Sequence, residues 1–195
     1  MYLNALEVRK KLTEQNSETY LPDLTETQFN FGILFSDLGR FEDAEDMWVN
    51  SLKTYKMLAE KSPKIYLHKV AETLNNLGIL YQNLNKFETA LMKFNEVLEI
   101  NLDNQEAWAQ KGYCLHKLKR YHEAEESNDK ALKIDVKYSI AWYNKACIES
   151  IKNNKEKSID FLKISIDLDK KFIDMAKADQ DFDNIRSSKE FKELT

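Results

Sequence analysis

Apolar residues recur along this chain with the spacing of an amphipathic helix, and these runs come in pairs. The apolar face of one such run, within residues 74–81, consists of Leu74, Leu77, Gly78 and Tyr81. After the polar stretch NLNK at 83–86, the pattern resumes with Phe87, Ala90, Phe94 and Val97. This spacing predicts two amphipathic helices joined by a tight turn.

Gly78 is unexpected in the middle of an apolar face, because glycine inside a helix costs roughly 1 kcal/mol relative to alanine. Gly78 and Ala90 fall on the faces by which the two helices would meet. Small residues there allow a close approach, while Tyr81, Phe87 and Phe94 fill the surrounding space. We therefore predict that Gly78 and Ala90 set the distance between the two helices.

The helical pair is repeated along the chain. An offset of 46 residues aligns 20–44 with 66–90 and matches, among others, Gly32 with Gly78 and Ala44 with Ala90. From Gly78 onward an offset of 34 residues brings Gly112 and then Ala146 to the same position. Four consecutive units are therefore predicted.

Composition and charge narrow the class of protein. Only four Gly and two Pro occur in 195 residues, which favours an all-α fold over a sheet. The 29 basic residues are interleaved with 33 acidic ones for a net charge of −4, so we do not expect a nucleic-acid partner. Residues 1–15 lack the apolar core of a signal peptide and no apolar run is long enough to span a membrane, so we expect a cytoplasmic protein without a membrane partner.

The repeated positions resemble the tetratricopeptide repeat, whose 34-residue signature combines Leu-Gly, Tyr, Ala and Phe at the spacing found in 74–97. The stretch SPKIYLHKVAETLNNLG at 62–78 is similar to the lengthened repeats of kinesin light chains. The resemblance implies an all-α, right-handed superhelical solenoid of antiparallel helix pairs. The interval of 46 residues implies a long second helix from Phe41, and Ser62-Pro63 indicates the next helix start.

We assign the chain to one solenoid domain with six parts. These are a half-repeat helix (1–16), repeat 1 (17–61), repeat 2 (62–103), repeat 3 (104–137), repeat 4 (138–170) and C-terminal capping helices (171–195). We expect the cap to be built on Phe172, Met175, Phe182, Ile185, Phe191 and Leu194, with Ser187 and Glu190 at the spacing of a capping box.

Residues 2–15 align with the second helix of repeat 1, so the chain opens in mid-repeat. The inner face of this helix, with Tyr2, Ala5 and Leu6, either lacks a partner and promotes a homodimer, or lies on the neighbouring helix.

No catalytic constellation is found. His68, His116 and His122 are scattered, and no phosphate-binding loop or metal-binding motif occurs, so we expect neither an enzyme nor a cofactor. Cys114 and Cys147 lack the spacing of metal ligands and are expected to be reduced and partly buried. His116 and Cys147 could approach each other across neighbouring helices, but such an isolated pair is usually structural.

The resemblance implies that the first helices of the repeats line a concave groove that binds ligands. Two rows of residues face this groove at the spacing of one repeat. One row contains the amides Asn30, Asn76, Gln110 and Asn144, and the other contains Ile33, Ile79, Tyr113 and Cys147. Amides can pair with the backbone of an extended peptide, as asparagines do in the kinesin-light-chain-like repeats. The same face carries the acidic residues Glu26, Asp37, Glu72 and Glu106 against one clear base, Lys117, which favours a basic ligand.

The sequence therefore predicts a non-enzymatic module that binds a protein or peptide. The amides could instead be solvated or could bond between adjacent helices. Two other functions stay open, namely an assembly element that associates through the N-terminal helix and a regulatory arm of a larger protein.

Overall fold

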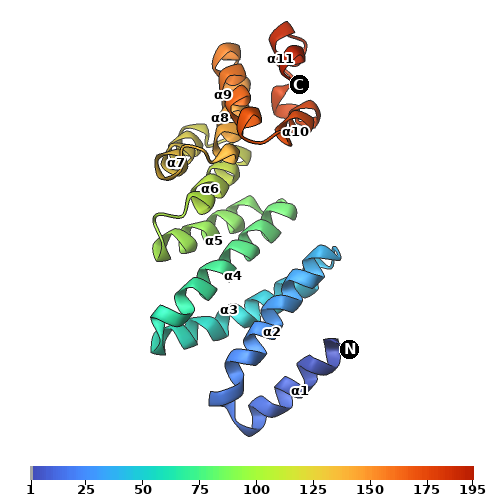
Figure 1. The fold of residues 1–195 in the computed structure, drawn as a ribbon, viewed down its shortest axis with the longest axis vertical. Helices are drawn as coiled ribbons and strands as arrows, with labels where there is room; N and C mark the ends of the chain where they lie inside the picture. Colours follow the sequence, from blue (N-terminus) through green and yellow to red (C-terminus); the bar gives the residue numbers. More distant parts are fainter. Residues whose placement is uncertain (1) are drawn as a thin grey trace. The chain divides into compact units, whose positions relative to one another are not determined.

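The structure is a computed structural model that describes the backbone of residues 2–195 and the side chains of 6–16 and 19–195 (Figure 1). The described residues form helices and no strand, which confirms the all-α prediction. The helices are α1 (Tyr2–Gln15), α2 (Ser17–Asp37), α3 (Phe41–Lys61), α4 (Pro63–Asn83), α5 (Phe87–Ile100), α6 (Gln105–Lys117), α7 (Tyr121–Ile134), α8 (Ser139–Ile151), α9 (Lys155–Leu168), α10 (Phe172–Ala178), the 3-10 helix η1 (Gln180–Phe182) and α11 (Lys189–Leu194).

The chain forms two compact units, Met1–Leu102 and Asp103–Thr195. The first contains α1–α5 and the second contains α6–α11. The boundary falls where the sequence separates repeat 2 from repeat 3. The assignment of all repeats to one domain stays a prediction.

Four antiparallel hairpins correspond to the four predicted repeats: α2–α3, α4–α5, α6–α7 and α8–α9. The long second helix of repeat 1 is confirmed, because α3 runs from Phe41 to Lys61. Helix α4 begins at Pro63, where proline is tolerated because a first-turn N–H has no partner within the helix.

The glycines of the first helices lie directly against a large side chain of the second helix. A Cβ atom placed on Gly78 would lie 2.6 Å from Cζ of the Phe94 ring, and one placed on Gly112 would lie 2.5 Å from Nδ2 of Asn128. Gly32 faces the indole of Trp48 in the same way. The predicted close approach of the two helices is therefore confirmed. The space beside each glycine is filled by the side chain sixteen residues later, which is Trp48, Phe94 or Asn128.

Each hairpin turns through the same backbone motif. One residue per turn has a positive φ, between 56° and 71°, and these residues are Gly39, Asn85, Lys119 and Asn153. In the first turn the Gly39 amide donates to the Ser36 carbonyl at 3.0 Å, and the Arg40 amide donates to the Phe35 carbonyl at 2.8 Å. These two bonds define a Schellman turn, which satisfies carbonyls at the end of the helix.

Helix α1 packs against α2. Leu6 is buried together with Leu24 and Phe31, and Arg9 donates a 2.8 Å hydrogen bond to the Asp23 carbonyl. Of the two alternatives that the sequence left open for the inner face of α1, the structure supports the second at Leu6, which lies on the neighbouring helix α2. Tyr2 and Ala5 lie outside the described side chains.

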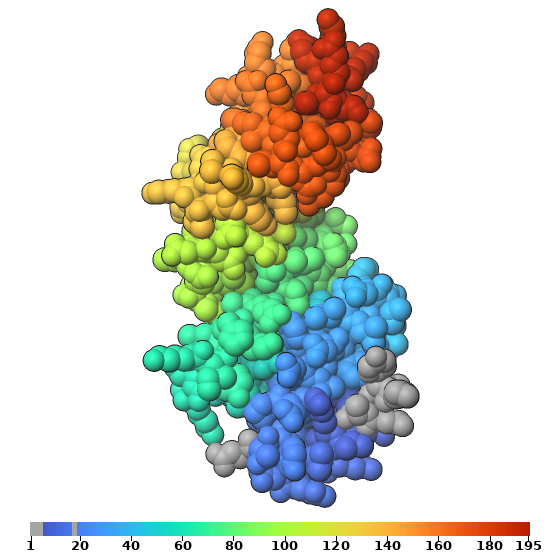
Figure 2. Space-filling model, in the orientation of Figure 1, coloured from blue at the N-terminus to red at the C-terminus, as the bar shows by residue number. Residues whose placement is uncertain are grey.

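The C-terminal segment covers the last hairpin, as predicted. Phe172, Phe182, Ile185 and Phe191 are buried against Tyr143 and Leu162, and Leu194 packs at the edge of this cluster. In Figure 2 the C-terminal residues, in red, lie against the orange atoms of the fourth hairpin. Met175 is 46% exposed, so its predicted role in the cap is wrong.

The predicted capping box of Ser187 and Glu190 does not form, because the N-cap is one residue later and Phe191, rather than a Glu or Gln, stands three residues after it. The hydroxyl of Ser188, rather than that of Ser187, accepts the Phe191 amide at 3.3 Å, and α11 begins at Lys189. Two adjacent serines made the register ambiguous, and the burial of Phe191 selects the second one.

Across the described part of the chain, no helix combines the length and apolar character needed to cross a membrane.

Candidate functional site

The predicted groove residues of the first unit gather on α2 and α4. A surface pocket of about 270 Å³ between these helices contains four residues of the predicted ligand surface and the acidic Asp37. It is lined by Ile33, Ser36, Asp37, Trp48, Glu72, Asn76 and Ile79. Ile33 of α2 and Ile79 of α4 occupy equivalent positions in successive repeats, and both line this pocket.

The amides of Asn30 and Asn76 make no hydrogen bond within the part of the chain that the structure describes. Asn30 is exposed, and Asn76 is half-buried at the pocket. Both side chains can therefore offer a donor and an acceptor to another molecule.

The charge of this surface is mainly negative. Lys69 Nζ lies 3.8 Å from Glu26 Oε1 and 3.5 Å from Glu72 Oε2, so one lysine partly balances two glutamates. Asp37 is exposed and forms no ion pair with any described residue. A cation at the pocket would meet an uncompensated carboxylate beside the apolar side chains of Ile33 and Ile79.

The row of amides does not extend to Asn144 in the second unit. Asn144 is only 6% exposed, and its Nδ2 donates to the Ala109 carbonyl and to Asn128 Oδ1, both at 3.1 Å. The prediction that Asn144 faces a ligand is therefore wrong. Its amide ties α8 to α6 and α7, because Asn128 replaces the ring found in the earlier repeats and needs a polar partner when buried.

The other predicted residues of the second unit lie on α6. Glu106 and Gln110 are half-buried there. Tyr113 is half-buried as well, with Lys117 Nζ 5.5 Å from its ring centroid. Burial raises the pKa of the Tyr113 hydroxyl, so this side chain stays neutral.

The C-terminal segment 179–184 lies on the face of α6 and α8 that the sequence assigned to a ligand. Asp181 Oδ2 is 2.8 Å from His116 Nε2 and 3.1 Å from Lys117 Nζ on α6. Asp179 Oδ2 accepts the Tyr143 hydroxyl of α8 at 2.9 Å and lies 3.7 Å from Cys147 Sγ. The protein itself therefore covers this part of the predicted groove.

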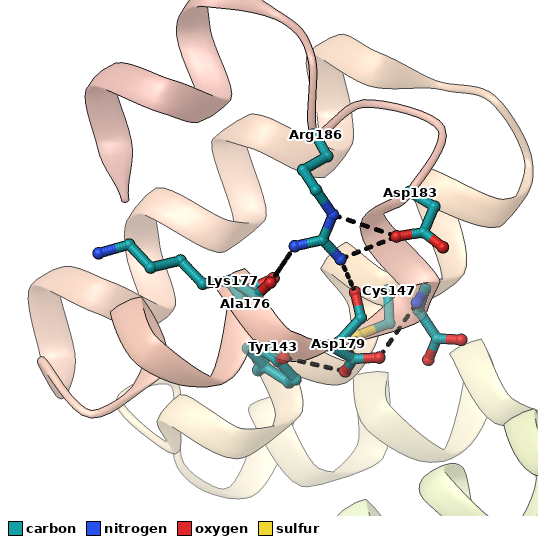
Figure 3. A network of polar contacts seen from close by, with 8 residues as sticks. Tyr143, Cys147, Ala176, Lys177, Asp179, Asp183 and Arg186 are labelled. Atoms are coloured by element: carbon teal, nitrogen blue, oxygen red, sulfur yellow. Dashed lines mark hydrogen bonds and ion pairs between the residues drawn. The ribbon is translucent and has the colours of Figure 1, made fainter.

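Arg186 fixes this segment (Figure 3). Its Nη2 donates to the Asp179 carbonyl at 2.6 Å and to Asp183 Oδ1 at 2.9 Å, and its Nη1 donates to the carbonyl of Lys177. One guanidinium thus bonds to both sides of η1 and holds Asp179 toward α8.

The charged groups under the segment stabilise each other. Although burial alone would raise it, the pKa of Asp181 is lowered by hydrogen bonds and charge from His116 and Lys117. Burial opposes the charge of Lys117, but Asp181 outweighs this effect and raises the pKa of Lys117. The carboxylate of Asp181 is therefore paired on two sides, whereas His116 Nδ1 is buried without a hydrogen-bond partner among the described residues.

Sequence reasoning missed Asp179, Asp181 and Arg186, because nothing in a local pattern tells where a short segment outside the repeats will fold back.

Three side chains in this network could offer metal ligands. The ligand atoms of Cys147, Asp179 and Asp181 lie within 4.8 Å of one another. However, burial raises the pKa of the Cys147 thiol, which opposes the thiolate that metals bind, and the Lys117 ammonium already occupies one side of Asp181. The structural interpretation of His116 and Cys147 fits this arrangement better.

The comparison with protein families matches three segments to the tetratricopeptide repeat: residues 70–101, 105–137 and 140–172. These segments contain α5, α6, α7 and α9, all of α8 except Ser139 and most of α4, and together they cover half of the chain. The chain belongs to the tetratricopeptide repeat family. A search of curated protein sequences gives no match.

Solved structures of similar fold are also tetratricopeptide arrays. MamA has a TM-score of 0.63 at 19% identity, with 90% of this chain and 91% of MamA aligned. A tetratricopeptide repeat protein of Parabacteroides merdae has a TM-score of 0.65 at 23% identity, with 89% of this chain and 63% of that one aligned. YrrB, described as a tetratricopeptide protein with an unusual peptide-binding site, has a TM-score of 0.52 at 23% identity, with coverages of 88% and 98%.

These likenesses establish the helical-repeat fold. Tetratricopeptide repeats are typically non-enzymatic. The repeat family supports a general role for this chain as a protein–protein interaction module.

Proposed function

We propose that the first unit binds an extended segment of a partner protein along α2 and α4, and that a lysine or arginine of this segment enters the α2–α4 pocket. The observation that carries the proposal is that the pocket is lined by Ile33, Glu72, Asn76 and Ile79, which the sequence assigns to a ligand surface through its resemblance to the tetratricopeptide repeat.

The chemistry of the pocket fits a long basic side chain. Ile33 and Ile79 offer apolar contact to its methylene groups, and Asp37 and Glu72 attract its charge. Lys69 leaves the net charge of this surface negative, since it faces both Glu26 and Glu72.

The unpaired amides of Asn30 and Asn76 fit the backbone of an extended segment. A peptide in this conformation exposes donors and acceptors that need partners, and each amide supplies one of each. The fold-level likeness to YrrB is consistent with such a ligand and does not define the contacts. In the second unit the equivalent face is covered by residues 179–184, so the bound segment contacts α2 and α4 rather than α8.

A phage-displayed library of random, unstructured peptides tests the proposal. Selection on the immobilised full chain should enrich peptides with Lys or Arg, and fluorescence anisotropy then measures their affinity. The double variant Asn30→Ala/Asn76→Ala should bind about tenfold more weakly.

The matched control is Asn50→Ala, because Asn50 is an exposed asparagine on α3, away from the α2–α4 pocket. Its affinity should stay within about twofold of the original. Selected peptides without basic residues, or equal affinity for the double variant and the control, would contradict the proposal.

A further inference from the structure

A second surface of the first unit results from unequal helix lengths. Helices α3 and α4 have 21 residues each, whereas α5 has 14. At 1.5 Å per residue, α5 is shorter by about 10 Å. The first turns of α4 therefore extend past the end of α5 at Ile100 (Figure 1). A groove of about 390 Å³ lies between α3, α4 and α5.

The floor of this groove is apolar. Leu67, Val70 and Leu74 of α4 lie at positions i, i+3 and i+7, which places them on one face of the helix. Leu74 is buried, while Leu67 at the open end is 41% exposed. A large apolar side chain that is half-exposed in a groove favours contact with another apolar surface.

The rim of the groove is acidic. Lys56 of α3 and Glu96 of α5 form a 2.7 Å ion pair, and Lys93 also contacts Glu96 at 2.6 Å. Glu60 and Glu99 are exposed and form no ion pair with the described residues. Of the four charged side chains that line the groove, three are acidic.

Glu99 is unfavourably placed for helix stability. It lies in the last turn of α5, which contains no basic residue, and the carbonyl end of a helix dipole repels negative charge. A cation supplied from outside would relieve this repulsion.

We propose that this groove docks a short, basic, amphipathic helix of a partner protein, laid on α4 in continuation of α5. Its apolar face covers Leu67 and Val70, and its Lys or Arg residues meet Glu60 and Glu99. This site is separate from the α2–α4 pocket and does not rest on the function proposed for that pocket.

Fluorescence anisotropy with two labelled helical peptides tests the inference on the full chain. Both peptides carry the same leucine face, and the remaining positions are Lys in one and Glu in the other. The Lys peptide should bind and the Glu peptide should not. Glu99→Lys and Leu67→Asn should each weaken binding of the Lys peptide about tenfold.

Two controls separate this site from general attraction of cations. Glu88→Lys makes the same charge change at an exposed position in the first turn of α5, and Asn76→Ala alters the α2–α4 pocket. Both should leave the affinity within about twofold. Equal weakening by Glu88→Lys and Glu99→Lys, no effect of Leu67→Asn, weakening by Asn76→Ala, or equal binding of the two peptides would overturn the inference. Circular dichroism of each variant verifies that it is folded.

Discussion

At the residue scale, each glycine of a first helix and the side chain opposite it form one packing unit. Phe94 is fully buried, and the missing side chain of Gly78 leaves room for its ring. This pairing explains why a glycine stands inside the helix. The free energy gained by burying the Phe94 ring exceeds the loss of helix propensity at Gly78.

Gly78→Leu should destabilise the first unit by about 1–3 kcal/mol, because the new side chain overlaps the Phe94 ring. Thermal or urea unfolding measures the effect. Asn83→Leu, at an exposed position on the same helix, is the control and should change stability little. Equal stability of both variants would contradict the packing described for Gly78.

Asp181→Asn should lower stability by about 1–3 kcal/mol near pH 7, because it removes a charged partner of His116 and Lys117. The pKa of Asp181 is lowered in the folded state, so its stabilising effect exists above the unfolded pKa of about 3.9 and is lost as pH falls through the folded pKa.

The difference in free energy of unfolding between Asp181→Asn and the original chain should therefore become smaller below about pH 4. Urea unfolding at neutral and acidic pH measures it. Asp160→Asn should show no such dependence, because Asp160 is an exposed carboxylate on α9 that forms no ion pair with the described residues. A constant difference at all pH values would mean that the charge of Asp181 is not the cause.

The sequence could predict residues whose role follows from periodicity, such as Gly78, Ala90 and Phe94. It could not predict the role of Asn144, because the same register position is exposed at Asn30 and buried at Asn144. The difference depends on Asn128, a neighbour in space that replaces an apolar ring and leaves a polar atom to satisfy.

At the element scale, the four hairpins share one turn geometry although their sequences differ. The residue with positive φ is glycine once, asparagine twice and lysine once. Asparagine tolerates this conformation better than most residues, whereas in lysine the Cβ atom lies too close to the following carbonyl oxygen and the conformation is strained. The turn geometry is therefore imposed by the packing of the helices on either side.

Lys119→Gly should stabilise the second unit by about 0.5–1 kcal/mol, because glycine adopts the φ of 61° at this position without strain. Urea unfolding measures the gain. Lys163→Gly, at an exposed position inside α9, should destabilise by about 1 kcal/mol. A loss of stability in both variants would show that the Lys119 side chain itself contributes to the turn.

The sequence predicted the hairpins and their approximate limits because helical periodicity is a local signal. It predicted a C-terminal cap from the apolar residues of the segment that follows the last repeat, among them Phe172, Phe182 and Phe191. It could not predict that η1 would lie on the inner face of α6 and α8, because that contact joins residues such as Lys117 and Asp181, far apart in the chain.

At the scale of the whole molecule, each of the two units buries a large side chain at the same repeat position. Phe94 in the first unit and Leu162 in the second are both fully buried opposite the small residue of their hairpin. In repeat proteins the stability of each hairpin depends mainly on contacts with its neighbours. A destabilising substitution should therefore increase local unfolding only in its own hairpin and in adjacent helices.

Phe94→Ala should cost about 3–5 kcal/mol and reduce amide protection in α2–α5, whereas Leu162→Ala should cost about 2–5 kcal/mol and reduce it in α8 and α9. Native-state hydrogen exchange measures both patterns, and each variant is the control for the other. Loss of protection throughout the chain in both variants would indicate one cooperative unit.

The way residues 169–195 fold back also bears on attempts to lengthen this protein by design. A further helical pair appended after Thr195 would find the apolar face of α9 at Leu162 and Ile166 already covered, because Phe172 and Phe182 are buried against it. Additional repeats would have to be inserted before Asp169. Residues 169–195 would then follow the new last hairpin and cover it as they cover the present one.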